Sequence, residues 1–108
     1  MVNPNIIVAQ MKGAITMGLS AAMKEKIDFA NGGVQTANFY NYKELRMDEA
    51  PEIEVHLVKT KDTMGGIGEP GLPPIGPAVA NALFKASGIR MHRLPMTPEN
   101  VTDAMKKK

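Results

Sequence analysis

Apolar residues recur at helical spacing in the first quarter of the chain, just after an Asn3-Pro4 pair. Asparagine is a good helix N-cap, and proline is tolerated at the first helical position. The pattern therefore predicts a helix over residues 4–26. Its apolar positions follow one another at helical intervals: Ile7, Met11, Ala14, Ile15, Gly18, Leu19 and Ala22.

Small residues make one side of this predicted helix nearly flat. Gly13 and Gly18 each cost on the order of 1 kcal/mol of helix stability relative to alanine. Three alanines accompany them: Ala14, Ala21 and Ala22. Such a side suits close approach by another backbone or by a flat ligand. Gln10 is the one long uncharged polar residue in the apolar half, and the residues alone favour a solvent-facing side chain there.

Two further stretches predict β structure. Residues 27–29 and 34–36 are typical of a short hairpin, because the intervening Asn31-Gly32 pair supplies the positive φ angles of a tight turn. Residues 52–58 alternate between polar and apolar side chains, which is the pattern of a strand with one buried face.

Two more helices are predicted in the second half. One covers residues 77–87 and ends at Gly88; the other begins at Thr97, which caps it, and extends to about Lys106. The order of elements predicts a single α+β domain, residues 1–108. In this domain a small antiparallel sheet, made of the hairpin plus one longer strand, packs against two or three helices.

Composition and charge argue against several function classes. The chain contains no cysteine, which excludes disulfides, thiolate metal sites and iron–sulfur ligation by its own residues. A net charge of +2 and 5% aromatic residues do not favour a nucleic-acid partner. We expect no membrane span, because no run reaches about 18 apolar residues, and no signal peptide. His56 and His92, the only histidines, do not make a zinc site, and no metal ligand is predicted.

Residues 64–77 combine five glycines and four prolines with one carboxylate, Glu69. Residues 66–71 match G-x-G-x-x-G, but prolines delay the following helix and Glu69 would repel phosphate, so a dinucleotide site is not favoured. Glu69 itself has three interpretations that the residues leave open. It is a base removed from water by its apolar surroundings, an exposed loop glutamate, or a cap of the loop's own amides.

Residues 66–82 closely resemble the C-terminal signature of the molybdenum hydroxylases, the xanthine dehydrogenase and aldehyde oxidase superfamily. The proline-rich form is most similar to the molybdopterin-binding large subunit of the isoquinoline 1-oxidoreductase type. Residues 9–14, 49–55 and 93–99 resemble further parts of that subunit in the same order. The resemblance thus covers nearly the whole chain.

The resemblance implies an oxidative hydroxylation of an aldehyde or N-heterocycle at a molybdopterin centre. By match, Glu69 is the general base and Gln10 contacts the pterin. Gly13, the small residues after it and Gly68 would lie against the cofactor, molybdopterin cytosine dinucleotide or a related form. The family's subunit is several times longer than 108 residues, so we expect this chain alone to bind no cofactor.

The implied partners are the remainder of the molybdopterin-binding subunit and an iron–sulfur subunit, with self-association as another way to cover the exposed surface. The implied location is cytoplasmic, or periplasmic if the chain is exported with a partner. The alternative function is a non-catalytic, stand-alone remnant or binding domain that keeps the fold. The substrate is not determined by these residues.

Overall fold

The first helix begins where its N-cap predicts. A computed structural model describes residues 1–107, and in it α1 spans Pro4–Met23. The side-chain oxygen of Asn3 accepts hydrogen bonds from the backbone N–H groups of Asn5, at 3.1 Å, and Ile6, at 3.3 Å. These bonds satisfy donors that have no partner within the helix. The helix ends three residues before the predicted boundary.

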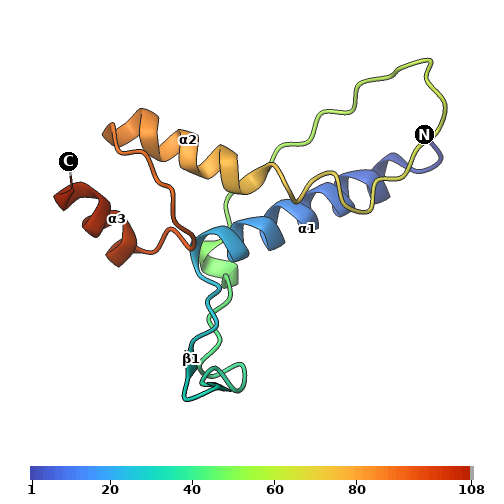
Figure 1. The fold of residues 1–108 in the computed structure, drawn as a ribbon. Helices are drawn as coiled ribbons and strands as arrows, with labels where there is room; N and C mark the ends of the chain where they lie inside the picture. The colour runs from blue at the N-terminus through green and yellow to red at the C-terminus, as the bar shows by residue number, and fades with distance from the viewer. Residues whose placement is uncertain (108) are drawn as a thin grey trace.

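The predicted hairpin is confirmed, although its strands are short. β1 (Phe29–Ala30) pairs antiparallel with β2 (Gly33–Val34). Asn31 and Gly32 have φ angles of 51° and 74°, as a tight turn requires. Both strands are exposed and project away from the helices in Figure 1, so the expected packing of the sheet on the helices does not occur. The side chain of Phe29 is 72% exposed, because nothing in residues 1–107 covers it.

The third strand expected at residues 52–58 does not form a ladder within residues 1–107. The alternation survives in the exposure of the side chains: Ile53, Val55 and Leu57 are half-buried, and the residues between them are exposed. Alternation fixes which way side chains face, but a strand also needs a neighbour to accept and donate backbone hydrogen bonds. Residues 1–107 provide no such neighbour for this segment.

The two later helices form near their predicted positions. α2 spans Ile75–Ser87, beginning two residues before the predicted start, because the Pro74 carbonyl accepts the Ala78 N–H at 3.0 Å. Gly88 follows it with a φ of 71°, the left-handed conformation that ends helices. α3 spans Pro98–Lys106 and is capped by Thr97, as predicted. A short 3-10 turn, η1, covers Met47–Glu49.

The core lies where the C-terminal end of α1 meets α2, α3 and the segment between them (Figure 1). Its buried members are Ala22, Ile89, Met91 and Met96. The radius of gyration is 17.0 Å, against about 13 Å for a compact domain of this length. The accessible surface is 8583 Å², against about 5,900 Å² for a compact chain of this mass. The fold therefore leaves much apolar surface uncovered.

α1 is long and apolar enough to cross a membrane when judged by length and composition. It is the one helix in residues 1–107 that meets this test. Core helices of soluble proteins meet it too, and α1 packs on α2. Length and hydropathy therefore do not by themselves assign this helix to a bilayer.

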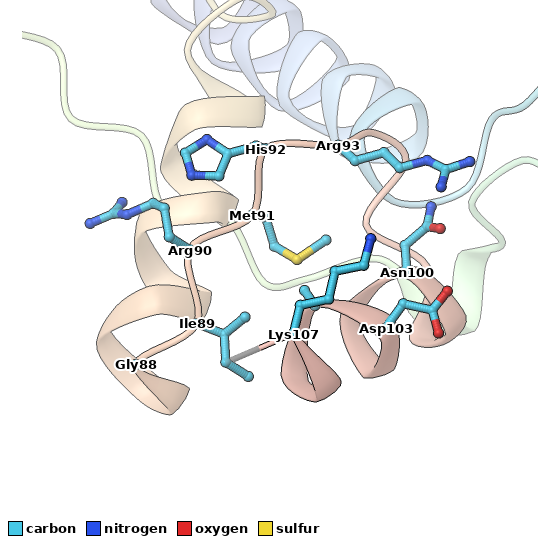
Figure 2. Close-up of a pocket in the computed structure, with 10 residues that line it drawn as sticks. Gly88, Ile89, Arg90, Met91, His92, Arg93, Asn100, Asp103 and Lys107 are labelled. Carbon is cyan, nitrogen blue, oxygen red and sulfur yellow. The ribbon is translucent and has the colours of Figure 1, made fainter.

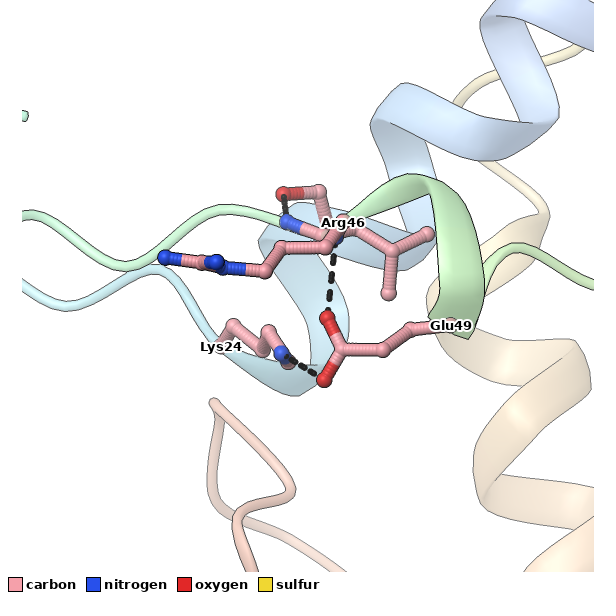
Figure 3. A network of polar contacts seen from close by, with 5 residues as sticks. Lys24, Arg46 and Glu49 are labelled. Carbon is pink, nitrogen blue, oxygen red and sulfur yellow. Dashed lines mark hydrogen bonds and ion pairs between the residues drawn. The ribbon is translucent and has the colours of Figure 1, made fainter.

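A polar network holds the segment that follows the hairpin against the C-terminal end of α1 (Figure 3). One carboxylate oxygen of Glu49 accepts the backbone N–H of Arg46 at 2.9 Å, and the other pairs with Lys24. Ser20, buried in α1, accepts the N–H of Leu45 at 3.0 Å. The Lys24 hydrogen bond, followed by the Arg46 N–H, holds the pKa of Glu49 below its ordinary value.

This network predicts an acid-sensitive contribution to stability. Because the pKa of Glu49 is lower in the folded chain, its contribution is present above the unfolded pKa of about 4.3 and is lost as the pH falls through the folded value. The difference between the urea unfolding midpoints at pH 6.5 and pH 3 should therefore be smaller for Glu49→Gln than for the unchanged chain. Glu52→Gln is the control, since Glu52 is exposed as Glu49 is but makes no ion pair within residues 1–107. Equal acid sensitivity of both variants would contradict this role.

Candidate functional site

α1 presents two different sides. Met11, Ala14 and Gly18 lie on a side that is turned inward, with Ala14 and Gly18 buried. Gln10 and Gly13 lie on another side and are exposed. Positions three or four apart share a side of a helix, so each set forms a continuous stripe. Ile6 and Met17, each 64% exposed, continue the stripe of Gln10 and Gly13.

On the inward side, the glycine- and proline-rich loop of residues 64–77 packs directly against the backbone of α1. A Cβ atom at Gly18 would lie 2.8 Å from the Leu72 carbonyl oxygen and 3.1 Å from Ile75 Cβ. A Cβ at Gly71 would lie 2.9 Å from Ala14 Cβ. The flat side was expected to lie under a cofactor, but Ala14 and Gly18 are occupied by this loop instead. Of the small residues singled out, Gly13 and Ala21 remain exposed.

Gln10 joins the exposed side of α1 to the loop. Its side-chain Nε2 donates a hydrogen bond to the carbonyl of Gly68 at 2.8 Å, across 58 residues of sequence. Gly68 directly precedes Glu69, whose carbonyl accepts the Leu72 N–H at 3.0 Å in the following turn. The Gln10 bond therefore positions the peptide next to Glu69. Nothing in the local sequence signals this contact, because the two segments meet only in the tertiary fold.

Glu69 is exposed, and its carboxylate makes no hydrogen bond or ion pair with residues 1–107. It is therefore not a cap of the loop's own amides. The loop also does not remove it from water by itself, because its neighbours Gly68 and Pro70 are too small to cover a carboxylate. Any such covering would come from outside residues 1–107.

The space beside Gln10 is open. A Cβ atom built at Gly13 or at Gly68 would meet nothing within 4 Å, so neither glycine is required by the packing of residues 1–107. The amide oxygen of Gln10 accepts no hydrogen bond from these residues, since its bond to the loop uses Nε2. A flat ligand with hydrogen-bond donors fits this combination of open space and a free acceptor.

Two hollows lie near the candidate site or away from it: the first borders the loop of Glu69, and the second lies elsewhere. One of about 1000 Å³ is an open depression lined by the N-terminal half of α1 and residues 58–67, with Pro70 at its end. Figure 2 shows the other, of about 500 Å³, between α2 and α3. Arg90 turns outward from it, where it donates to Asn81 at 2.8 Å and lies 3.7 Å over the Phe84 ring. Arg90 therefore does not contribute a charge to this hollow.

No group of three or more histidine or acidic side chains in residues 1–107 is arranged to hold a metal ion. A metal ion beside Gln10 would thus need ligands from outside these residues. An organic cofactor that carries its own metal meets this requirement.

Comparison with known proteins identifies the group to which this arrangement belongs. Residues 1–51 match the family model of a molybdopterin cofactor-binding domain. Isoquinoline 1-oxidoreductase subunit beta of Brevundimonas diminuta is 45% identical over 95 residues, which are 88% of this chain and 12% of that protein. The putative xanthine dehydrogenase molybdenum-binding subunit of Escherichia coli strain K12 is 30% identical over 106 residues, 92% of this chain and 14% of that one.

The chain belongs to the xanthine dehydrogenase family. It corresponds to one part of the family's molybdopterin-binding subunit, since it spans about an eighth of the first relative's length. The fold agrees: quinoline 2-oxidoreductase from Pseudomonas putida 86 matches 100% of this chain with a TM-score of 0.81 and 21% identity, over 15% of its own chain. The resemblance identified from residues 66–82 is thereby confirmed.

The family-model match divides the four predicted site residues into two pairs. Gln10 and Gly13 lie within the matched residues 1–51, whereas Gly68 and Glu69 lie beyond them. The hydrogen bond between Gln10 and the Gly68 carbonyl is the link between the cofactor-binding segment and the loop. The roles of these four residues in this family member stay predictions.

Proposed function

We propose that this chain supplies Gln10 and Glu69 to the molybdopterin site of a molybdenum hydroxylase whose other residues come from the remainder of the subunit. One observation carries the proposal: the Gln10 side chain binds the Gly68 carbonyl at 2.8 Å and so brings the loop of Glu69 to the exposed side of α1. The open space at Gly13 and Gly68 supports a cofactor at this place. Membership of the xanthine dehydrogenase family indicates which cofactor.

Each of the four residues has a separate role in such a site. Gln10 accepts a hydrogen bond from the pterin through its free amide oxygen, while its Nε2 positions the loop. Gly13 and Gly68 keep the adjoining space free of side chains. Glu69 accepts a proton at its carboxylate as general base. The bound cofactor, molybdopterin cytosine dinucleotide or a related form, supplies the oxidative hydroxylation of an aldehyde or N-heterocycle.

Two partners follow from the same proposal. The remainder of the molybdopterin-binding subunit covers the apolar surface that this chain leaves exposed, including Ile6 and Met17 beside Gln10. An iron–sulfur subunit removes the electrons, because a chain without cysteine cannot ligate such clusters by thiolate. Covering by the first partner would also exclude water from Glu69 and strengthen it as a base.

Cofactor content of an assembled protein tests the proposal. The chain is co-expressed with the Brevundimonas diminuta subunit lacking its aligned segment, and molybdenum and pterin are measured by elemental analysis and fluorescence. We expect Gln10→Ala to weaken cofactor retention about tenfold, because one hydrogen bond to the cofactor and the loop's anchor are both lost. Gln35→Ala is the matched control, since Gln35 also donates to backbone carbonyls but lies at the hairpin.

Full cofactor content in the Gln10→Ala assembly would contradict the proposed contact. An assembly that forms without any cofactor, even with the unchanged chain, would favour the alternative of a non-catalytic binding domain.

A further inference from the structure

Residues 52–58 have the side-chain arrangement of a strand and no strand beside them. Ile53, Val55 and Leu57 are half-buried, while Glu54 and His56 between them are exposed. The backbone of this segment makes no hydrogen bond with residues 1–107. Its N–H and C=O groups are therefore available on both edges to a further strand.

This segment is only partly protected as an exposed edge. Proteins shield edge strands with lysine, proline, bulges or a covering element, because an open edge pairs with any strand that reaches it. Residues 52–58 contain neither lysine nor proline, although Glu52 and Glu54 place charges on the exposed side, and Val58 at the end is 81% exposed. A half-buried apolar side on a backbone without hydrogen-bond partners favours pairing of this edge in the working assembly.

The structural relative indicates where the pairing strand comes from. The whole of this chain matches quinoline 2-oxidoreductase with a TM-score of 0.81, although it covers only 15% of that longer chain. The path of this chain, including the unpaired segment, is thus one that a much larger fold accommodates. The total accessible surface, 8583 Å² against about 5,900 Å² for a compact chain, agrees with burial by a large partner.

We propose that residues 52–58 add as a strand to a sheet in the remainder of the molybdopterin-binding subunit. This inference rests on the proposed function, because it takes the same partner. The main-chain hydrogen bonds hold the two pieces together, and the apolar side chains of Ile53, Val55 and Leu57 set the register. The segment would then join this chain to the partner at a place distinct from Gln10 and Glu69.

Proline substitutions test the pairing, because proline has no N–H to donate. Successive N–H groups point to opposite edges of a strand, so Glu54→Pro and Val55→Pro remove a donor from each edge in turn. The probe is the Brevundimonas diminuta subunit lacking its aligned segment, titrated with the labelled full chain. We expect at least one of the two variants to raise the Kd about tenfold or more.

Lys43→Pro is the matched control, since Lys43 is exposed and its N–H makes no backbone hydrogen bond in residues 1–107. Amide hydrogen exchange gives a second measurement. The amides of residues 53–57 should exchange fast in the free chain and become protected in the complex.

Wild-type affinity of both Glu54→Pro and Val55→Pro, with unprotected amides, would overturn the proposal. So would failure of the unchanged chain to bind, or protection that arises only in dimers of this chain, which would make a second copy the occupant. Both measurements, the Kd and the protection of the amides, report assembly and do not depend on cofactor content. A Gln10→Ala chain that assembles and keeps its cofactor would therefore remove the proposed function and leave the strand pairing standing.

Discussion

We expect Glu69→Gln to remove most of the turnover of the assembled hydroxylase while its molybdenum cofactor stays bound. Glutamine keeps the size and hydrogen-bonding reach of the side chain but cannot accept the proton. General-base catalysis contributes roughly 10²- to 10⁴-fold to rates of this kind, so we expect kcat to fall by at least about a hundredfold. Steady-state assays with an aldehyde and with an N-heterocycle, on protein normalised for molybdenum, provide the measurement.

Two controls separate catalysis from structure. Glu44→Gln makes the same chemical change at another exposed position and should leave turnover unchanged. The Glu69→Gln chain should assemble and retain pterin as the unchanged chain does, because the Glu69 carboxylate makes no hydrogen bond within residues 1–107. Turnover of Glu69→Gln near the unchanged rate would remove Glu69 from the proposed role.

Gly18→Ala destabilises the chain by about 1–3 kcal/mol, the typical cost of overpacking. The new methyl carbon would sit 2.8 Å from the Leu72 carbonyl oxygen, a backbone atom that cannot turn away. Either α1 or the loop must move, because the two pack directly on each other at Gly18. Urea unfolding followed by circular dichroism measures the loss of free energy of unfolding.

Gly13→Ala provides a matched comparison in the same helix. A Cβ at Gly13 meets nothing within 4 Å, and alanine favours an α-helix over glycine by about 1 kcal/mol. We therefore expect the free chain to gain stability. In the assembly the same methyl group would enter the space proposed for the cofactor, so cofactor content should fall. A Gly18→Ala chain as stable as Gly13→Ala would refute the close packing of loop on helix.

Local signals were sufficient for the helix starts and the hairpin turn. Asn3 before Pro4 caps α1, and Thr97 before Pro98 caps α3, because a side-chain oxygen and the free N–H groups of a first turn lie within a few residues of each other. Asn31-Gly32 forms the turn for the same reason: its positive φ angles are a property of those two residues.

The sequence by itself also determined the family, because the glycine–glutamate–proline run is specific enough to be recognised without coordinates. It did not determine the strand at residues 52–58. Alternation orients Ile53, Val55 and Leu57, but pairing depends on a distant partner that residues 1–107 do not provide.

Tertiary structure alone decided how the candidate site is arranged. In the sequence, Gly13 and Gly18 are equivalent small residues of one helix. The fold places the loop on Gly18 and leaves Gly13 beside open space. Likewise Gln10 and Gly68 are separated by 58 residues, and only the packing of the loop on α1 brings them to 2.8 Å. Such contacts depend on the path of the whole chain, whereas caps and turns depend on neighbouring residues.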